Sequence, residues 1–314
     1  APTVEPSRQS EATAPTAEPS IAPSVEPTTS PSMAPTVEPT AAPTLAASTD
    51  ASEALKNLSA SGASSSEFAD LIGAILVRQK TTSDGNAIVE DGAVTDMLSG
   101  IVSGVLGPGL VNATTEETAA AVTAAAQLLG NMSTDLGARM SPSATKNVGL
   151  ATRDVAQYAI DAGVPMKTEA LASLASTVST MVAVSAAPTA ENASFEAGVE
   201  NSQVLVEATE TIGDAAAIGL NEGDPPRKIS SPGLDMEVAR PGRVALASGG
   251  VAVAGFELPP LDLAADCTLQ HSKWAKNPYA FAGGGDFKVL SEGPGVVEAL
   301  SIRSGGSSVE VSGL

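Results

Sequence analysis

The stretch Asn221–Arg243, NEGDPPRKISSPGLDMEVARPGR, is where the hydrophobic pattern of the chain changes. Helix breakers gather at 223–226, where each proline fixes φ and lacks the N–H that a helix needs. From Leu234 to Val238, apolar residues then alternate with acidic ones, which is the period of two that predicts a strand. This stretch therefore separates a predicted helical part, 51–222, from a predicted strand-rich part, 223–314.

The part before this boundary has apolar residues at helical spacing. One stripe runs from Phe68 to Leu76 behind a possible capping box, Ser64-x-x-Glu67. A second stripe covers 94–106, and a second capping box, Thr114-x-x-Glu117, opens an Ala-rich helix. Further helices are expected at 143–162, 168–184 and 194–220. Because Ala-rich faces allow close helix approach but bury little area, we expect an Ala/Ser-rich bundle of about five or six helices.

The part after the boundary is rich in Gly, Pro and residues that favour strands. Runs of the latter occur at 251–256, 287–290, 296–302 and 308–311. The sequence predicts a small antiparallel, β-sandwich-like subdomain that is truncated at its C-terminal end. The fold class predicted for the chain is α+β.

The first fifty residues form a low-complexity repeat. Prolines recur at every fourth position from Pro15 to Pro43, and APTVEP occurs at both Ala1–Pro6 and Ala34–Pro39. Such proline density excludes helix and sheet, and the tract has little apolar area to bury. We expect residues 1–50 to be a disordered, polyproline-II-biased Pro/Thr/Ser/Glu stalk, O-glycosylated on Ser and Thr.

Charge excludes some classes of partner. The 314 residues carry 16 Lys+Arg against 36 Asp+Glu, a net charge of −20, which argues against nucleic acid and anionic membranes as ligands. The acidic residues form no run, which favours a solvated surface, with calcium binding as the alternative. Of the two most apolar stretches, 97–115 is broken by Gly107-Pro108-Gly109, and 170–190 carries several Ser and Thr residues. We expect membrane attachment only through segments outside this chain.

Four N-x-[ST] sequons mark candidate N-glycosylation sites: Asn57, Asn112, Asn131 and Asn192. Beside a Pro/Thr/Ser-rich tract, they favour an extracellular or cell-surface glycoprotein.

The only cysteine, histidine and tryptophan lie within Cys267–Phe287, CTLQHSKWAKNPYAFAGGGDF. A Cys267–His271 catalytic dyad would need a lowered thiol pKa and an oxyanion hole, and no sequence feature supplies either. The same pair supplies two zinc ligands where a structural site needs four, and Asp262 and Asp266 stand at generic spacing. The sequence therefore predicts no catalytic residue, cofactor or metal ligand.

The aromatic residues of this stretch are better explained as the core of the strand-rich part. Each buried aromatic side chain removes about 150–250 Å² from water, and Asn277-Pro278 and Gly283–Gly285 are typical of turns between strands. The candidate core residues are Trp274, Tyr279, Phe281 and Phe287.

A Ser/Ala-rich helical region is followed by GDPPRKISSPGLDMEV, FELPPLDL, KWAKNPYAF and PGVVEALSIRSGGSSVEVSGL. Over roughly Ser52–Leu314, this series resembles the juxtamembrane ectodomain of polycystin-like proteins of unicellular eukaryotes and algae. That region is related to the receptor-for-egg-jelly region and to the GAIN domain of adhesion receptors. The resemblance implies a helical subdomain, then a β-sandwich subdomain, then a GPS element and membrane helices.

The sequence departs from this family at the cleavage motif. GAIN autoproteolysis uses His-Leu-Ser/Thr, whereas His271 is followed by Ser272 and Lys273, and Cys267 has no partner cysteine. Cleavage is therefore not expected within this fragment, and a GPS element would lie beyond Leu314.

These patterns favour a non-enzymatic extracellular module of a cell-surface protein, which relays ligand binding or tension to a membrane part outside the fragment. Its expected partner is an extracellular protein or glycan. The alternative is a secreted structural glycoprotein of a cell wall or matrix, in which the stalk is a spacer. No arrangement of catalytic residues in the sequence supports a third possibility, a secreted hydrolase.

Overall fold

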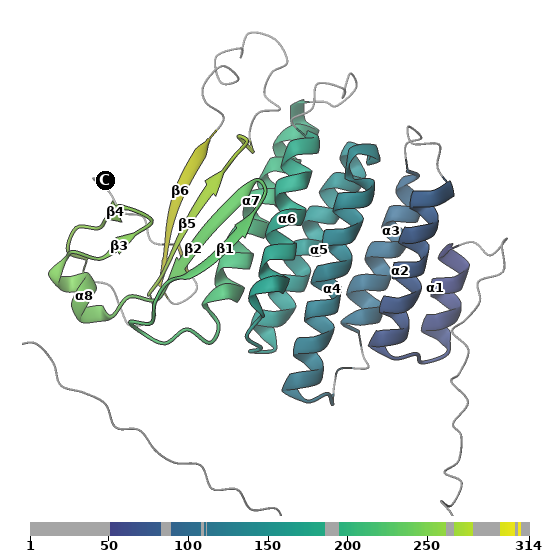
Figure 1. The fold of residues 1–314 in the computed structure, drawn as a ribbon, viewed down its shortest axis with the longest axis horizontal. Helices are drawn as coiled ribbons and strands as arrows, with labels where there is room; N and C mark the ends of the chain where they lie inside the picture. The colour runs from purple at the N-terminus through teal and green to yellow at the C-terminus, as the bar shows by residue number, and fades with distance from the viewer. Residues whose placement is uncertain are drawn as a thin grey trace, which may run out of the picture. The chain divides into compact units, whose positions relative to one another are not determined.

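The computed structural model describes residues 51–82, 89–107, 110, 112–185, 195–261, 267–278, 296–304 and 307–308. The predicted stalk lies outside these ranges. Residues 47–314 form one compact unit, and its described part is α+β, with helices first and antiparallel strands after them (Figure 1).

Seven α-helices precede the strands in the described residues. Their bounds are α1 Ala51–Ala60, α2 Ser65–Thr82, α3 Asp91–Ser99, α4 Thr115–Leu136, α5 Pro142–Asp161, α6 Thr168–Ser185 and α7 Phe195–Ala217. A π-helical segment, η1 (Gly100–Val105), continues α3, and a 3₁₀ turn, η3 (Gly137–Arg139), follows α4. The patterns predicted α2 to α7, but they did not predict α1.

The helices form a two-layered stack rather than a bundle around one axis. Helices two apart in the sequence pack on each other, most extensively α5 on α7 and α4 on α6, and α1, α3 and α2 continue the layers. Figure 1 shows this succession from α1 to α7.

Small residues permit this close packing, as the Ala-rich faces predicted. A Cβ added to Gly149 of α5 would lie 2.9 Å from Val204 Cγ1 of α7, and one on Gly130 of α4 would lie 3.4 Å from Ser173 Cβ of α6. Glycine at position 149 lets α5 and α7 approach without a shift of the facing side chain, whereas a Cβ at position 130 would make no more than a close van der Waals contact.

The change from helix to strand falls between Ala217 and Arg227, as the sequence predicted. The strands are β1 Arg227–Ser231, β2 Leu234–Ala239, β3 Ala252–Val253, β4 Phe256–Glu257, β5 Cys267–Trp274, β6 Val297–Ser304 and β7 Ser307–Ser308. The main sheet has the order β1-β2-β5-β6-β7 with antiparallel neighbours, and β3 and β4 form a separate ribbon. The crossover from β2 to β5 carries a short helix, α8 (Arg243–Ser248), and this ribbon.

The inner face of the sheet packs on the end of the helix stack. The register pairs Leu234 with Trp274 and Val238 with Gln270, which places these four side chains on one face. β1 and β2 contact α6, and β2 and β5 contact α7. Helices and strands therefore share one core.

The outer face is covered by α8 and the β3–β4 ribbon. A small cluster of buried residues joins these elements to β2, β5 and β6: Ala239, Leu246, Val253, Leu258, Cys267, Leu269 and Ile302. In the described residues, the strand-rich part thus has a five-stranded sheet, with helices on its inner face and α8 and the β3–β4 ribbon on its outer face. No helix in the described ranges combines the length and apolarity that a membrane crossing requires.

Candidate functional site

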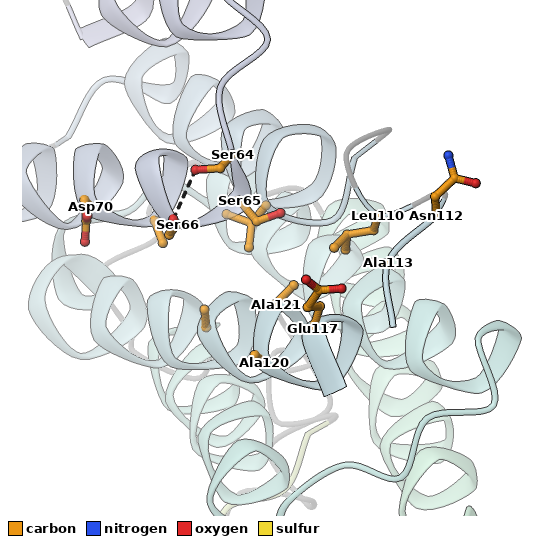
Figure 2. A pocket seen from close by; sticks show the side chains of 13 residues that line it. Ser64, Ser65, Ser66, Asp70, Leu110, Asn112, Ala113, Glu117, Ala120 and Ala121 are labelled. Carbon is orange, nitrogen blue, oxygen red and sulfur yellow. Dashed lines mark hydrogen bonds between the residues drawn. The ribbon is translucent and has the colours of Figure 1, made fainter. Parts of the chain in front are cut away.

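A cavity of about 630 Å³ lies where the first turns of α2 and α4 meet the segment that follows η1. Its lining includes Ser64 to Ser66 at the start of α2, Glu117 near the start of α4, and Asn112 and Ala113 before α4 (Figure 2).

Each of the two helices begins with a capping box, which confirms both sequence predictions. Ser64 N donates to Glu67 Oε2 at 2.7 Å, and Glu67 N donates to Ser64 Oγ at 3.4 Å. In the same way, Thr114 N donates to Glu117 Oε2 at 2.7 Å, and Glu117 N donates to Thr114 Oγ1 at 3.2 Å. These bonds satisfy backbone N–H groups that a helix leaves without a partner in its first turn.

Of the two capping carboxylates, that of Glu117 belongs to the lining of the cavity, and Asp70 of α2 adds a second carboxylate to it (Figure 2). A backbone hydrogen bond from Ser64, and then a hydroxyl bond from the same residue, lower the pKa of Glu67. Thr114 lowers the pKa of Glu117 by the same two bonds. A free helix N-terminus attracts anions, but here the chain's own carboxylates take that position, and Glu117 and Asp70 make the lining of the cavity acidic.

Apart from these carboxylates and the amide of Asn112, the lining is apolar and hydroxylic. Ala69, Ala120, Ala121 and Ala124 contribute methyl groups, while Ser65 contributes a hydroxyl. Such a lining can bind a neutral ligand that has both hydroxyl groups and apolar faces.

The sequence did not predict this cavity. It identified both capping boxes, but it gave no sign that helix starts about fifty residues apart lie side by side.

Trp274 lies on the inner face of the sheet with 3% of its surface exposed, between Leu234 of β2 and Val297 of β6. The other three candidate core residues, Tyr279, Phe281 and Phe287, lie outside the described residues. So do Asp262, Asp266 and Gly283–Gly285.

The structure separates Cys267 from His271. Both lie on β5, and four residues of extended strand place their Cα atoms about 13 Å apart. Burial raises the pKa of the Cys267 thiol, which disfavours the thiolate that catalysis and zinc binding need. The His271 ring contacts Phe256 at a centroid distance of 5.3 Å, and its Nε2 lies 3.5 Å from Glu298 Oε2. Among the described residues, no cluster of His, Cys, Asp and Glu side chains could hold a metal ion.

The candidate glycosylation sites lie in different kinds of secondary structure. Asn57 is exposed on α1, Asn112 is exposed in a turn, and Asn131 is exposed on α4, whereas Asn192 lies outside the described residues.

Polar contacts that join the sheet to α7 were also not predicted. Gln270 Nε2 donates to Thr209 O at 3.1 Å, and Arg303 of β6 forms an ion pair with Asp214. Burial raises the pKa of Asp214, and the charge of Arg303 opposes that rise. Separately, Ser202 Oγ of α7 donates to a backbone carbonyl in the turn after β5, at 2.5 Å. No local pattern marks these pairs, because each joins residues more than sixty positions apart.

Compared with known proteins, the chain matches no protein-family model and no curated protein.

Proposed function

We propose that this chain is a non-enzymatic extracellular module of a polycystin-like or adhesion-receptor-like cell-surface protein. In this role it relays ligand binding or tension to a membrane part outside residues 1–314. The observation that supports the proposal is the order of the fold: a helical part precedes an antiparallel sheet and packs against it. The ectodomains that the sequence resembles have the same order.

The contacts between sheet and helices suit the transmission of force. β6 pairs with β5 along its full length, from Val297–Trp274 to Ser304–Cys267. Its Arg303 also pairs with Asp214 of α7. A load on β6 therefore passes both into the sheet and directly into the last helix of the stack, so that helices and strands resist it together.

The cavity at the other end of the stack suits the partner expected from the sequence. Its hydroxyl and carboxylate groups can accept hydrogen bonds from sugar hydroxyls, and its alanines offer apolar contact. A glycan end fits this chemistry better than a polyanion, because the carboxylates of Asp70 and Glu117 in the lining repel negative charge.

The alternative is a secreted structural glycoprotein of a cell wall or matrix. The proline repeat at every fourth position supports it equally, because an extended spacer serves either role.

Location in the natural cell separates the two. The protein is tagged at its own locus, intact cells are labelled with a membrane-impermeant amine reagent, and membranes are washed with alkaline carbonate. The proposal expects labelled protein that stays in the washed membrane pellet. Labelled protein released into the medium, or extracted from the wall, would favour the alternative. Protein that is labelled only after the cells are lysed would contradict both.

A further inference from the structure

One sequon lies in an exposed turn. The chain turns twice after η1, where Leu110 N donates to Gly107 O and Ala113 N donates to Leu110 O, each at 3.1 Å. Asn112 and Thr114 of this segment are both exposed. Thr114 has extended backbone, with φ −67° and ψ 160°. Both residues of this sequon that a glycosyltransferase reads are therefore exposed in the folded chain, and the Thr114 hydroxyl also belongs to the capping box, where it donates to Glu117 Oε2 at 2.9 Å.

The sequon of α4 differs at its third residue and lies within a helix instead of a turn. Asn131 is exposed, but Met132 and Ser133 are fully buried. Ser133 Oγ donates to Gly130 O at 2.9 Å within the helix. A glycosyltransferase that reads Asn-x-Ser/Thr must reach the hydroxyl as well as the amide, so the folded α4 hides half of this sequon.

We infer that Asn112 is an N-glycosylation site and that Asn131 stays unmodified. The assignment rests on the proposed extracellular location, since it needs the secretory pathway and its polyisoprenyl-diphosphate-linked oligosaccharide as donor. Nδ2 of Asn112 bonds to C1 of the first N-acetylglucosamine and loses one proton. The bond from C1 to the diphosphate oxygen breaks, and the lipid diphosphate leaves.

The position of Asn112 keeps the glycan clear of the cavity. Figure 2 shows the Asn112 amide pointing away from Glu117 and from the serines at the start of α2. A glycan on this nitrogen extends from the edge of the cavity into solvent, which leaves the cavity open for a ligand.

The structure also supplies variants that separate glycosylation from folding. Thr114 is both the third residue of the sequon and the N-cap of α4. Asn112→Gln removes the sequon and keeps the cap, whereas Thr114→Ser keeps both. Asn131→Gln is the matched control, because it removes an exposed asparagine from the other sequon.

The test uses residues 1–314 secreted from a eukaryotic host, in a background with Asn57→Gln and Asn192→Gln. Peptide N-glycosidase should produce one mobility step in this background and in the Asn131→Gln and Thr114→Ser variants. It should produce none in Asn112→Gln. When the glycan is released in heavy-oxygen water, peptide mapping should find the oxygen label at position 112 alone. Thermal melts of the deglycosylated variants should have the same midpoint as that of the deglycosylated background protein.

An Asn112 peptide that is unlabelled in the secreted protein would overturn the inference. So would a mobility step that Asn131→Gln removes. The same mapping on protein from its natural cells tests the location separately: Asn112 modified in the secretion host but bare in the natural protein would refute the extracellular proposal and not the choice of site.

Discussion

Replacing Trp274 with alanine should destabilise the helices as well as the sheet. The indole is buried on the inner face of β5, where the sheet meets the helix stack. It is also the only tryptophan in the chain.

The magnitude follows from the buried area. A buried aromatic side chain covers about 150–250 Å², and about 25 cal/mol per Å² gives about 4–6 kcal/mol as an upper figure. Substitutions of buried Phe or Trp by Ala cost about 3–5 kcal/mol. We therefore expect Trp274→Ala to lower the free energy of unfolding by about 3–5 kcal/mol, which is a large share of a usual margin of about 5–15 kcal/mol.

Urea denaturation followed by far-UV circular dichroism measures this loss, because the variant lacks the tryptophan whose fluorescence would otherwise be followed. In the wild type, the emission shift of Trp274 and the loss of helical signal should coincide, since the two parts share one core. Lys273→Ala is the control: its side chain is half exposed on the other face of the same strand, and its midpoint should stay close to wild type. A loss below about 1 kcal/mol in Trp274→Ala, or separate transitions for emission and helix in the wild type, would refute this reasoning.

The remaining predictions are also measured as changes in stability, by urea denaturation or thermal melts followed by far-UV circular dichroism. Gly213→Ala should lower the denaturation midpoint, because the new Cβ would lie 1.9 Å from Gln270 Oε1. This loss should occur although alanine is more favourable than glycine in a helix by about 1 kcal/mol. Adding Gln270→Ala should restore most of the lost stability. Ser141→Ala removes the N-cap bond to Ala144 N and should cost about 1 kcal/mol, while Ser141→Thr should retain most of the stability. The pKa of Glu117 is lower in the folded chain than its ordinary value of 4.5. As the pH falls, the carboxyl of the unfolded chain therefore takes up a proton before that of the folded chain does. Stability from this group is full above that value and is lost below it, so melts from neutral pH to about pH 3 should show a shallower decline in Glu117→Gln than in wild type.

Local signals predicted the positions of most elements. The capping boxes at Ser64 and Thr114 are present, and the helix-to-strand change falls at the predicted breakers. These features are local because caps and periodicity depend on residues within one or two turns of each other. In contrast, α1 has only ten residues, and so short a helix is marginal alone. It is held by packing on α2 and α3, which no local pattern reveals.

The candidate site shows the same division. The sequence singled out the stretch Cys267–Phe287 and did not favour a catalytic or zinc-binding pair of Cys267 and His271, and the extended conformation of β5 keeps these two residues apart. It marked the sequons without ranking them, and the burial of Ser133 and the exposure of Thr114 supply the ranking. Burial depends on the neighbours that pack on a residue, so a tripeptide motif cannot report it.

The sequence by itself determined the α+β class, the boundary near Pro225 and the starts of α2 and α4, because each follows from neighbouring residues. Only the tertiary structure decided that the helices stack in two layers, that the sheet closes the end of that stack, and that two capped helix starts enclose a cavity. Those features depend on pairs such as Asp214–Arg303 and Thr209–Gln270. Their members meet only after the intervening chain has folded, because their energies come from three-dimensional proximity and not from spacing along the chain.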